Sequence, residues 1–193
     1  MARCVAFLRA INVGGHVVKM EQLRALFEAM KFERVETFLA SGNVVFEHAG
    51  FDGAGFDNAA NSAESDLELA ARIEARLLKA LGYAVSTFVR TDAEIARIAG
   101  QRPFAAAAMK TAATFCVGML GAAPAADVER RLMALQSAED DFRVLGRELY
   151  WLGQKNQGKA VISNAVLEKA LGMRTTLRGM NTMQRLAAKY PAG

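Results

Sequence analysis

The order of strand-like and helix-like segments constrains this chain more than any single motif. Residues 4–9 and 43–47 are continuously apolar, which is typical of inner strands buried on both faces. Between them, residues 20–30 carry apolar side chains at helical spacing, and residues 35–39 favour a strand. The sequence Ala-Ser-Gly-Asn at 40–43 predicts a hairpin turn. The chain therefore begins with the order strand, helix, strand, strand.

A second helix and a fourth strand complete this pattern. Ser65 and Glu68 have the spacing of a capping box, which predicts a helix start, and Gly82 is suited to end that helix. Residues 83–90 favour a strand. The resulting βαββαβ order is that of a ferredoxin-like fold, in which the first and third strands are central. The two continuously apolar segments occupy those central positions, so the apolar pattern and the topology agree.

The second half of the chain repeats this order. We expect a strand at 112–120, a helix after Pro124, two strands within 141–153 around Gly146, a helix that ends at Gly172, a short strand at 173–177 and a final helix capped by Asn181 and Gln184. The predicted fold class is therefore α+β, with two ferredoxin-like halves, mainly antiparallel sheets and a C-terminal helix.

The repeated order divides the chain into three predicted parts. Residues 1–90 form an N-terminal ferredoxin-like subdomain. Residues 91–110 form a connecting helix, opened by a capping pair at Thr91 and Glu94, and a linker with a helix-breaking proline. Residues 111–193 form a C-terminal ferredoxin-like subdomain with the final helix.

Composition excludes several classes of protein. The 193-residue chain is 52% hydrophobic with a formal net charge of +4, which is compatible with an anionic partner but far from a histone-like excess. Its two cysteines lie in apolar runs, which predicts buried thiols and a cytoplasmic location. The two histidines and dispersed cysteines lack metal-ligand spacing, so we expect no metal and no cofactor. No apolar run approaches the ~20 residues needed to span a bilayer, and no signal-peptide cleavage site is present, so we expect no membrane partner.

Two polar, glycine-bearing loops carry the candidate site. In the predicted topology, the end of the first strand and the hairpin between strands two and three lie at the same end of the sheet, so residues 11–16 and 40–43 should meet there. Glycine lets a backbone approach a ligand closely, and the start of the first helix offers unpaired N–H groups to an anion. The candidate ligand-binding residues are Arg9, Asn12, Gly14, Gly15, Ser41, Gly42 and Asn43, with Arg178 and Asn181 if the C-terminal half contributes.

The same residues also suit tight turns that bind nothing. Glycine and asparagine tolerate positive φ, and an asparagine side chain can satisfy nearby backbone groups. The sequence Asn-Val-Gly-Gly lacks the spacing of a Walker loop and of the dinucleotide-binding fingerprint. His16 and Ser41 do not complete a nucleophilic triad, because no acid stands at a suggestive position, and His48 is expected to be solvated. The sequence therefore identifies no catalytic residue.

Several longer segments carry a family resemblance. Residues 7–46, which begin FLRAINVGGHVVKM, closely resemble the opening of a bacterial domain-of-unknown-function family numbered 1697. GRELYWLG and SNAVLEKALG resemble its later segments, and TLRGMNTMQRLAA resembles its closing T-x-R-N-W-N-T-x-x-K-L segment. The resemblance implies a compact α+β protein with ferredoxin-like halves and no established activity.

This sequence departs from the family pattern in two places. Gly179 and Met180 stand where the pattern has Asn and Trp, and the usual Gly-x-x-Ser-Lys loop appears as QGKAVIS. A ligand site that used the C-terminal segment would therefore be altered in this protein.

Three kinds of function remain open from the sequence. The first is a cytosolic protein that binds an anionic ligand, such as a nucleotide, phosphate or single-stranded nucleic acid, at the loop end of the N-terminal sheet. The second is an enzyme of unknown reaction at the same place, where His16 is the only nearby histidine. The third is a scaffold or oligomer component whose loops are turns only. The sequence decides neither the ligand, nor whether there is catalysis, nor the oligomeric state.

Overall fold

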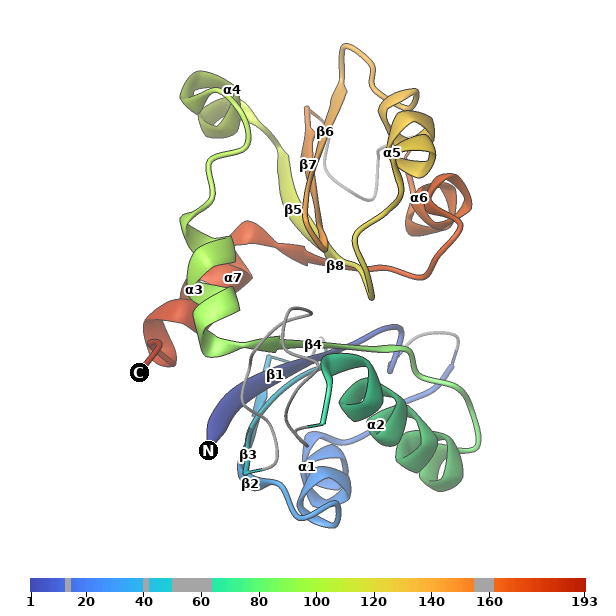
Figure 1. The fold of residues 1–193 in the computed structure, drawn as a ribbon, viewed down its shortest axis with the longest axis vertical. Coiled ribbons are helices and arrows are strands. Elements are labelled where there is room, and N and C mark those ends of the chain that lie inside the picture. Colours follow the sequence, from blue (N-terminus) through green and yellow to red (C-terminus); the bar gives the residue numbers. More distant parts are fainter. Residues whose placement is uncertain (13–14, 40–41, 50–63, 155–161) are drawn as a thin grey trace. The chain divides into compact units, whose positions relative to one another are not determined.

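The computed structural model describes residues 1–12, 15–39, 42–49, 64–154 and 162–193 (Figure 1). The chain divides into two compact units: Met1–Ile95 with Tyr190–Gly193, and Ala96–Lys189. It passes from the first unit to the second within a helix, and residues 190–193 return to the first unit. The three-part domain division expected from the sequence stays a prediction.

The first unit has the predicted βαββαβ order. Its elements are β1 (Ala2–Leu8), α1 (Met20–Glu28), β2 (Glu33–Phe38), β3 (Asn43–His48), α2 (Asp66–Leu81) and β4 (Thr87–Thr91), followed by the start of α3 (Asp92–Gly100) (Figure 1). Within the described residues, the strands form an antiparallel four-stranded sheet in the order β2-β3-β1-β4. The two continuously apolar strands, β1 and β3, are central, as the sequence predicts.

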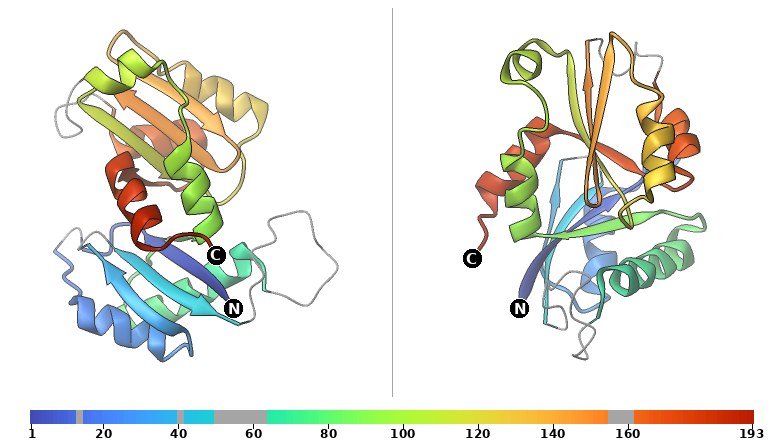
Figure 2. Two further views of the ribbon diagram at one scale, coloured as in Figure 1. Left: turned by 90° about the vertical axis from the view of Figure 1, so that its left-hand side faces the viewer. Right: turned by 45° about the horizontal axis from the view of Figure 1, so that its top comes forward.

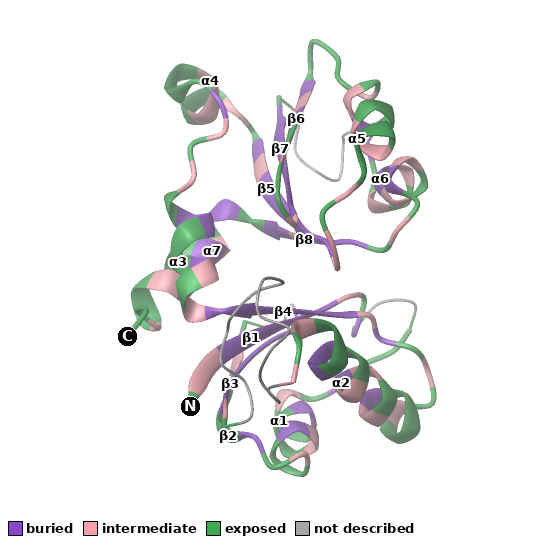
Figure 3. Ribbon diagram, viewed as in Figure 1, coloured by how far each residue is buried: buried purple, intermediate pink, exposed green. Residues whose placement is uncertain are grey.

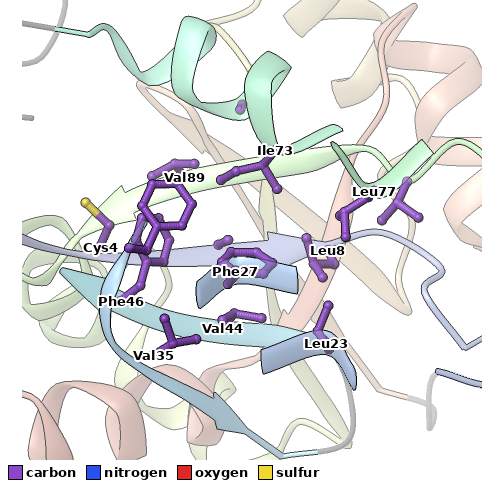
Figure 4. Packing of buried hydrophobic residues seen from close by; sticks show 14 of the residues in the cluster. Cys4, Leu8, Leu23, Phe27, Val35, Val44, Phe46, Ile73, Leu77 and Val89 are labelled. Carbon is purple, nitrogen blue, oxygen red and sulfur yellow. The ribbon is translucent and has the colours of Figure 1, made fainter. Parts of the chain in front are cut away.

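One face of this sheet packs against α1 and α2 to form the first core. Cys4, Leu8 and Phe46 from the strands pack with Phe27 of α1 and Ile73 of α2 (Figure 4). The rings of Phe27 and Phe46 lie 5.6 Å apart between centroids. Figure 3 shows that buried residues follow the strands, while the outer surfaces of the helices are exposed. Burial of each such large apolar side chain contributes about 1.5–3 kcal/mol to the stability of the fold. The positions of the apolar residues in the strands and helices therefore determine which faces pack together.

Local sequence signals set the ends of the helices in this unit. The Ser65 hydroxyl accepts a hydrogen bond from the N–H of Glu68, and the Glu68 carboxylate accepts one from the N–H of Ser65, which confirms the capping box. Gly82 ends α2 in the left-handed conformation, with φ of +80°. Thr91 and Glu94 form the second predicted capping box at the start of α3.

The second unit repeats the order of the first. After the end of α3 come α4 (Ala106–Thr111), β5 (Thr114–Met119), α5 (Ala126–Met133), β6 (Asp140–Leu145), β7 (Glu148–Gly153), α6 (Asn164–Leu171), β8 (Thr176–Gly179) and α7 (Met180–Lys189). Its described strands form an antiparallel four-stranded sheet in the order β6-β7-β5-β8. Both units therefore have the α+β architecture expected from the sequence. In the described part of the chain, no helix has the length and apolar character to cross a membrane.

The second core lies between the second sheet and the helices α5 and α6, which cover the same face (Figure 2). Trp151 is completely buried there and stacks on Phe142 with ring centroids 6.2 Å apart. Its indole N–H donates to Asp140 Oδ1 at 2.8 Å, so the polar atom of this large side chain is satisfied inside the core.

Four elements differ from the sequence-based expectations, one of them the last strand, which was expected at 173–177 and is β8 at Thr176–Gly179. Tyr83 and the three residues after it are not part of a strand, because β4 begins at Thr87. Asn181 does not cap the final helix, because α7 begins at Met180, directly after β8. The segment expected to be a linker before residue 111 contains the short helix α4, whose alanine-rich sequence favours a helix even though a proline precedes it.

Candidate functional site

The two loops predicted to converge do meet at one end of the first sheet. The N–H of Leu8 donates to the carbonyl of Gly42 at 2.8 Å, and Phe7 is paired with Asn43 in the sheet. Gly42 has φ of +75°, and a Cβ placed on it would lie only 2.7 Å from Ile11 Cγ2. Glycine is therefore required at this position by both backbone conformation and close approach. We call this end of the sheet, formed by residues 8–12, 15–19 and 42–43, the rim.

The two rim asparagines both bond to the backbone. Asn43 is completely buried, and its Nδ2 donates to the carbonyl of Phe38 at 2.9 Å, inside the hairpin. Asn12 is exposed, and its Oδ1 accepts from the N–H of Val18 at 2.7 Å, which closes the loop before α1. These contacts are those of turn-forming asparagines. A ligand contact for either residue stays a prediction, and Gly14 and Ser41 lie outside the described residues.

The backbone at the rim adopts the left-handed region at several residues. Gly15 has φ of +88°, which glycine accepts freely. Ala10 in the rim and Leu39, directly after β2, have φ of +57° and +58°, which is uncommon for residues with a Cβ. Such residues cost of order 1–3 kcal/mol each and persist where the surrounding structure holds them. The conformation of the rim is thus maintained by its neighbours in the fold.

An open hollow of about 300 Å³ lies beside the loop that precedes α1. It is lined by Gly15, His16, Val17, Val18, Gln22, Ala80, Leu81 and Tyr83. The hydroxyl of Tyr83 donates to the carbonyl of Ile11 at 2.8 Å, which ties the segment after α2 to the rim. The Tyr83 ring also stacks on the ring of His16, with centroids 3.8 Å apart and an interplanar angle of 19°.

Sequence reasoning missed most residues of this hollow, among them the polar side chains of Tyr83 and Gln22. Tyr83 was expected in a strand, although an aromatic residue directly after a helix-ending glycine is equally suited to pack back on a loop. Gln22 lies in the first turn of α1 and carries no signal of its own in the sequence. Only the packing of the end of α2 against the loop brings these side chains together.

The start of α1 offers backbone donors to this region. Lys19 occupies the N-cap position without a side-chain cap bond, whereas Ser65 caps α2 in the same unit. The first intrahelical bond runs from the N–H of Leu23 to the carbonyl of Lys19, so the N–H groups before Leu23 have no helical acceptor. The exposed Lys19 adds positive charge, and Glu21 in the first turn opposes it. Arg9 is half-buried at the end of β1.

Arg178 and Asn181 belong to the second unit. Arg178 lies on β8, where its Nη1 donates to Thr176 Oγ1 at 2.8 Å and to the carbonyl of Leu177 at 2.9 Å. Burial lowers the pKa of this guanidinium to about 10. Asn181 is exposed in the first turn of α7. Their participation in a ligand site stays a prediction.

A second polar cluster lies at the opposite end of β3 from the rim. His48 Nε2 lies 3.0 Å from Glu64 Oε2, and Arg72 donates to Glu64 from Nε at 2.8 Å and from Nη2 at 2.6 Å. The hydrogen bond from Arg72 is the main cause that lowers the pKa of the Glu64 carboxyl. The His48 side chain is 19% exposed, so the expectation that it is solvated is wrong.

Both cysteine thiols lie inside the protein. Cys4 and Cys116 are free and buried, and burial raises the pKa of both, for Cys116 to about 11. A thiol with a raised pKa is a poor nucleophile, so these cysteines serve as apolar core residues. The described residues contain no group of three or more His, Cys, Asp or Glu side chains arranged to hold a metal ion.

Comparisons with known proteins agree with the fold and add no activity. The family described as "Protein of unknown function (DUF1697)" matches residues 1–150. The solved structure of the conserved bacterial protein SP0830 from Streptococcus pneumoniae is similar over 100% of this chain and 99% of its own chain, with a TM-score of 0.66 and 17% sequence identity. At this identity the similarity shows the fold alone. No curated protein matches the sequence.

Proposed function

Since this chain belongs to the DUF1697 family, whose description assigns no activity, we propose from the rim alone that it binds an anionic ligand there. The ligand would be a nucleotide, an inorganic phosphate or a single-stranded nucleic acid. The backbone near Gly15 and the N–H groups at the start of α1 would meet the anion, and Asn12 would contribute its amide. Arg9 and Lys19 would supply positive charge.

The observation that carries this proposal is the hollow of about 300 Å³ beside the loop. Its volume is at the lower end of the range of small-molecule sites, and it combines loop backbone with side chains from α1 and the end of α2. Gly15 carries no side chain, and the space beside it is open, because a Cβ built there would have no atom within 4 Å. The hollow is therefore open beside the start of α1, whose first N–H groups have no helical acceptor.

Electrostatics supports an anion over a cation. The uncapped start of α1 carries a partial positive charge from the helix dipole, and Lys19 stands directly before it. An anion placed there gains about 0.3–1 kcal/mol from each such interaction at low salt. The formal net charge of +4 for the whole chain favours the approach of the same class of ligand.

The proposal can be tested with inorganic phosphate and backbone amide NMR on the full chain. We expect phosphate to shift the amide resonances of residues 15–22 in a concentration-dependent and salt-sensitive way. Lys19→Ala should weaken binding about two- to fivefold, because it removes one such charge interaction. Lys110→Ala is the matched control, since Lys110 is equally exposed but lies on α4. Resonance shifts confined to residues away from the rim would contradict the proposal.

A further inference from the structure

We infer that the ligand at the rim is a single nucleotide, whose base stacks on the ring of His16 while its phosphate meets the start of α1. This inference rests on the proposed anion site and names the chemical class of its ligand. It starts from the His16–Tyr83 ring pair, because a flat aromatic surface contributes nothing to the binding of a simple phosphate.

The ring pair is built as a platform. Tyr83 is held at both ends, because it follows the helix-ending Gly82 and its hydroxyl donates to the carbonyl of Ile11 at 2.8 Å. His16 lies nearly parallel to it, with ring centroids 3.8 Å apart and planes inclined by 19°. His16 is exposed, while Tyr83 is half-buried, so the pair presents the imidazole to solvent. Purine and pyrimidine rings stack on surfaces of this kind.

The other groups of the hollow suit the remaining parts of a nucleotide. The side-chain amide of Gln22 both donates and accepts hydrogen bonds, so it can pair with the edge of a base, which also carries donors and acceptors. Val17 and Val18 also line the hollow, and Val17 is 84% exposed. Lys19 and the start of α1 follow directly in the chain, within reach of a phosphate on the same ligand. The hollow therefore has an aromatic platform and an amide, and it lies beside the start of α1.

The size of the site favours one nucleotide over a strand. Proteins that bind single strands present successive aromatic side chains along a charged groove. In the parts of the first unit that the structure describes, one exposed ring pair adjoins this hollow, and its volume of about 300 Å³ suits a small ligand.

The test is a calorimetric titration of the full chain with adenosine monophosphate, adenosine and inorganic phosphate. We expect the nucleotide to bind at least tenfold more tightly than phosphate. His16→Ala should remove most of that difference, by about tenfold, because stacking is lost while the helix start remains. His16→Phe should retain the tighter nucleotide binding, because it keeps a flat ring. His48→Ala is the matched control, since it removes the chain's other histidine, at the opposite end of β3.

Together, the outcomes distinguish failure of the inference from failure of the proposed function. If phosphate binds at the rim as tightly as the nucleotide, the inference fails and the anion site stands. If none of the three probes binds, both fail. If adenosine binds as tightly as the nucleotide, the phosphate contributes nothing to binding, and both the anion site and the nucleotide inference fail. A ten-residue oligonucleotide that binds far more tightly than the mononucleotide would replace the single-nucleotide site by a strand-binding one.

Discussion

The two units share one scaffold at the end where their first strand stops. In the first unit, the N–H of Leu8 donates to the carbonyl of Gly42 in the hairpin, and in the second the N–H of Leu120 donates to the carbonyl of Arg147. The two bonds have nearly the same length, 2.8 and 3.0 Å. The order of the strands in the sheet is also the same. The sequence order alone therefore produced the same tertiary contact twice.

The connections that leave these two first strands are different. In the first unit the connection from β1 to α1, residues 9–19, is the longer one, and its residues 15–18 line part of the hollow. In the second unit the connection from β5 to α5, residues 120–125, is short and consists mostly of alanine and glycine with one proline. The sheet tolerates both, because a connection outside the sheet does not have to fit its register. The shared sheet topology therefore does not specify a ligand site. The feature that distinguishes the first unit is its connection from β1 to α1.

The largest effects should come from the equivalent core residues Phe46 and Trp151. Phe46 pairs with Cys4 in the first sheet, and Trp151 pairs with Cys116 in the second. Truncation of either residue to alanine should lower the free energy of unfolding by about 3–5 kcal/mol, because a large buried ring is lost. Urea denaturation measures the loss.

The same pair of variants tests whether the units are independent. Hydrogen exchange should show that Phe46→Ala reduces amide protection mainly within residues 1–95 and Trp151→Ala mainly within residues 96–189. Equal loss of protection across the whole chain in both variants would show one cooperative unit instead.

The two hairpin glycines should respond differently to alanine. Both Gly42 and Gly146 have positive φ, but only at Gly42 would a Cβ collide, with Ile11 Cγ2 at 2.7 Å. Gly146→Ala should cost about 1–2 kcal/mol for the strained backbone alone. Gly42→Ala should cost about 2–4 kcal/mol, because overpacking adds to the strain. Equal destabilisation of the two variants in thermal unfolding would mean that the rim is not packed as described.

A smaller effect should depend on pH and concerns the first unit only. The β3 strand ends at His48 in the Glu64–Arg72 cluster, whereas β7 ends at Gly153. Because the folded-state pKa of Glu64 lies below its ordinary value of 4.5, its contribution is full at neutral pH and is lost as the pH falls through the folded value. Glu64→Gln should therefore cost about 1 kcal/mol near pH 7 and progressively less below pH 4.5. A cost that stays constant with pH in urea titrations would exclude the ionised carboxylate as the cause.

The smallest effect should come from the C-terminal residues that return to the first unit. The hydroxyl of Tyr190 donates to Glu36 Oε2 at 2.6 Å, and its ring meets that of Phe38 edge-on. Tyr190→Phe removes the hydrogen bond and keeps the ring, so we expect a loss of about 0.5 kcal/mol at this largely exposed contact. Tyr190→Ala is the companion variant, and it should cost more because the ring contact is also lost. Identical stabilities for both variants and the wild type would show that the contacts of Tyr190 with Glu36 and Phe38 do not stabilise the first unit.

Much of the fold could be predicted from the sequence because its signals are local. Ser65 and Glu68 specify a helix start through their own side chains, and Gly82 specifies its end. The apolar pattern of β1 and β3 requires burial on both faces, which only central strands provide. The errors arose where a local signal competed with a tertiary contact, as at Tyr83, whose hydroxyl binds Ile11.

The candidate site was predictable only in part. Chain order predicts that Leu8 and Gly42 lie together, and the hydrogen bond between their backbones confirms it. Chain order does not predict that the Asn43 side chain is buried, because an asparagine at this position suits both a turn and a ligand contact. The stacking of His16 on Tyr83 joins residues that no short-range pattern connects.

The sequence by itself determined which segments are strands and helices, their order and therefore the shared sheet topology, because each of these depends on neighbouring residues and on which faces must leave water. Only the tertiary structure decided which polar side chains of the rim form hydrogen bonds to the backbone and which are exposed at the hollow. That division depends on distances between groups far apart in the chain, such as the end of α2 and the loop before α1, and those distances are set by how the cores pack.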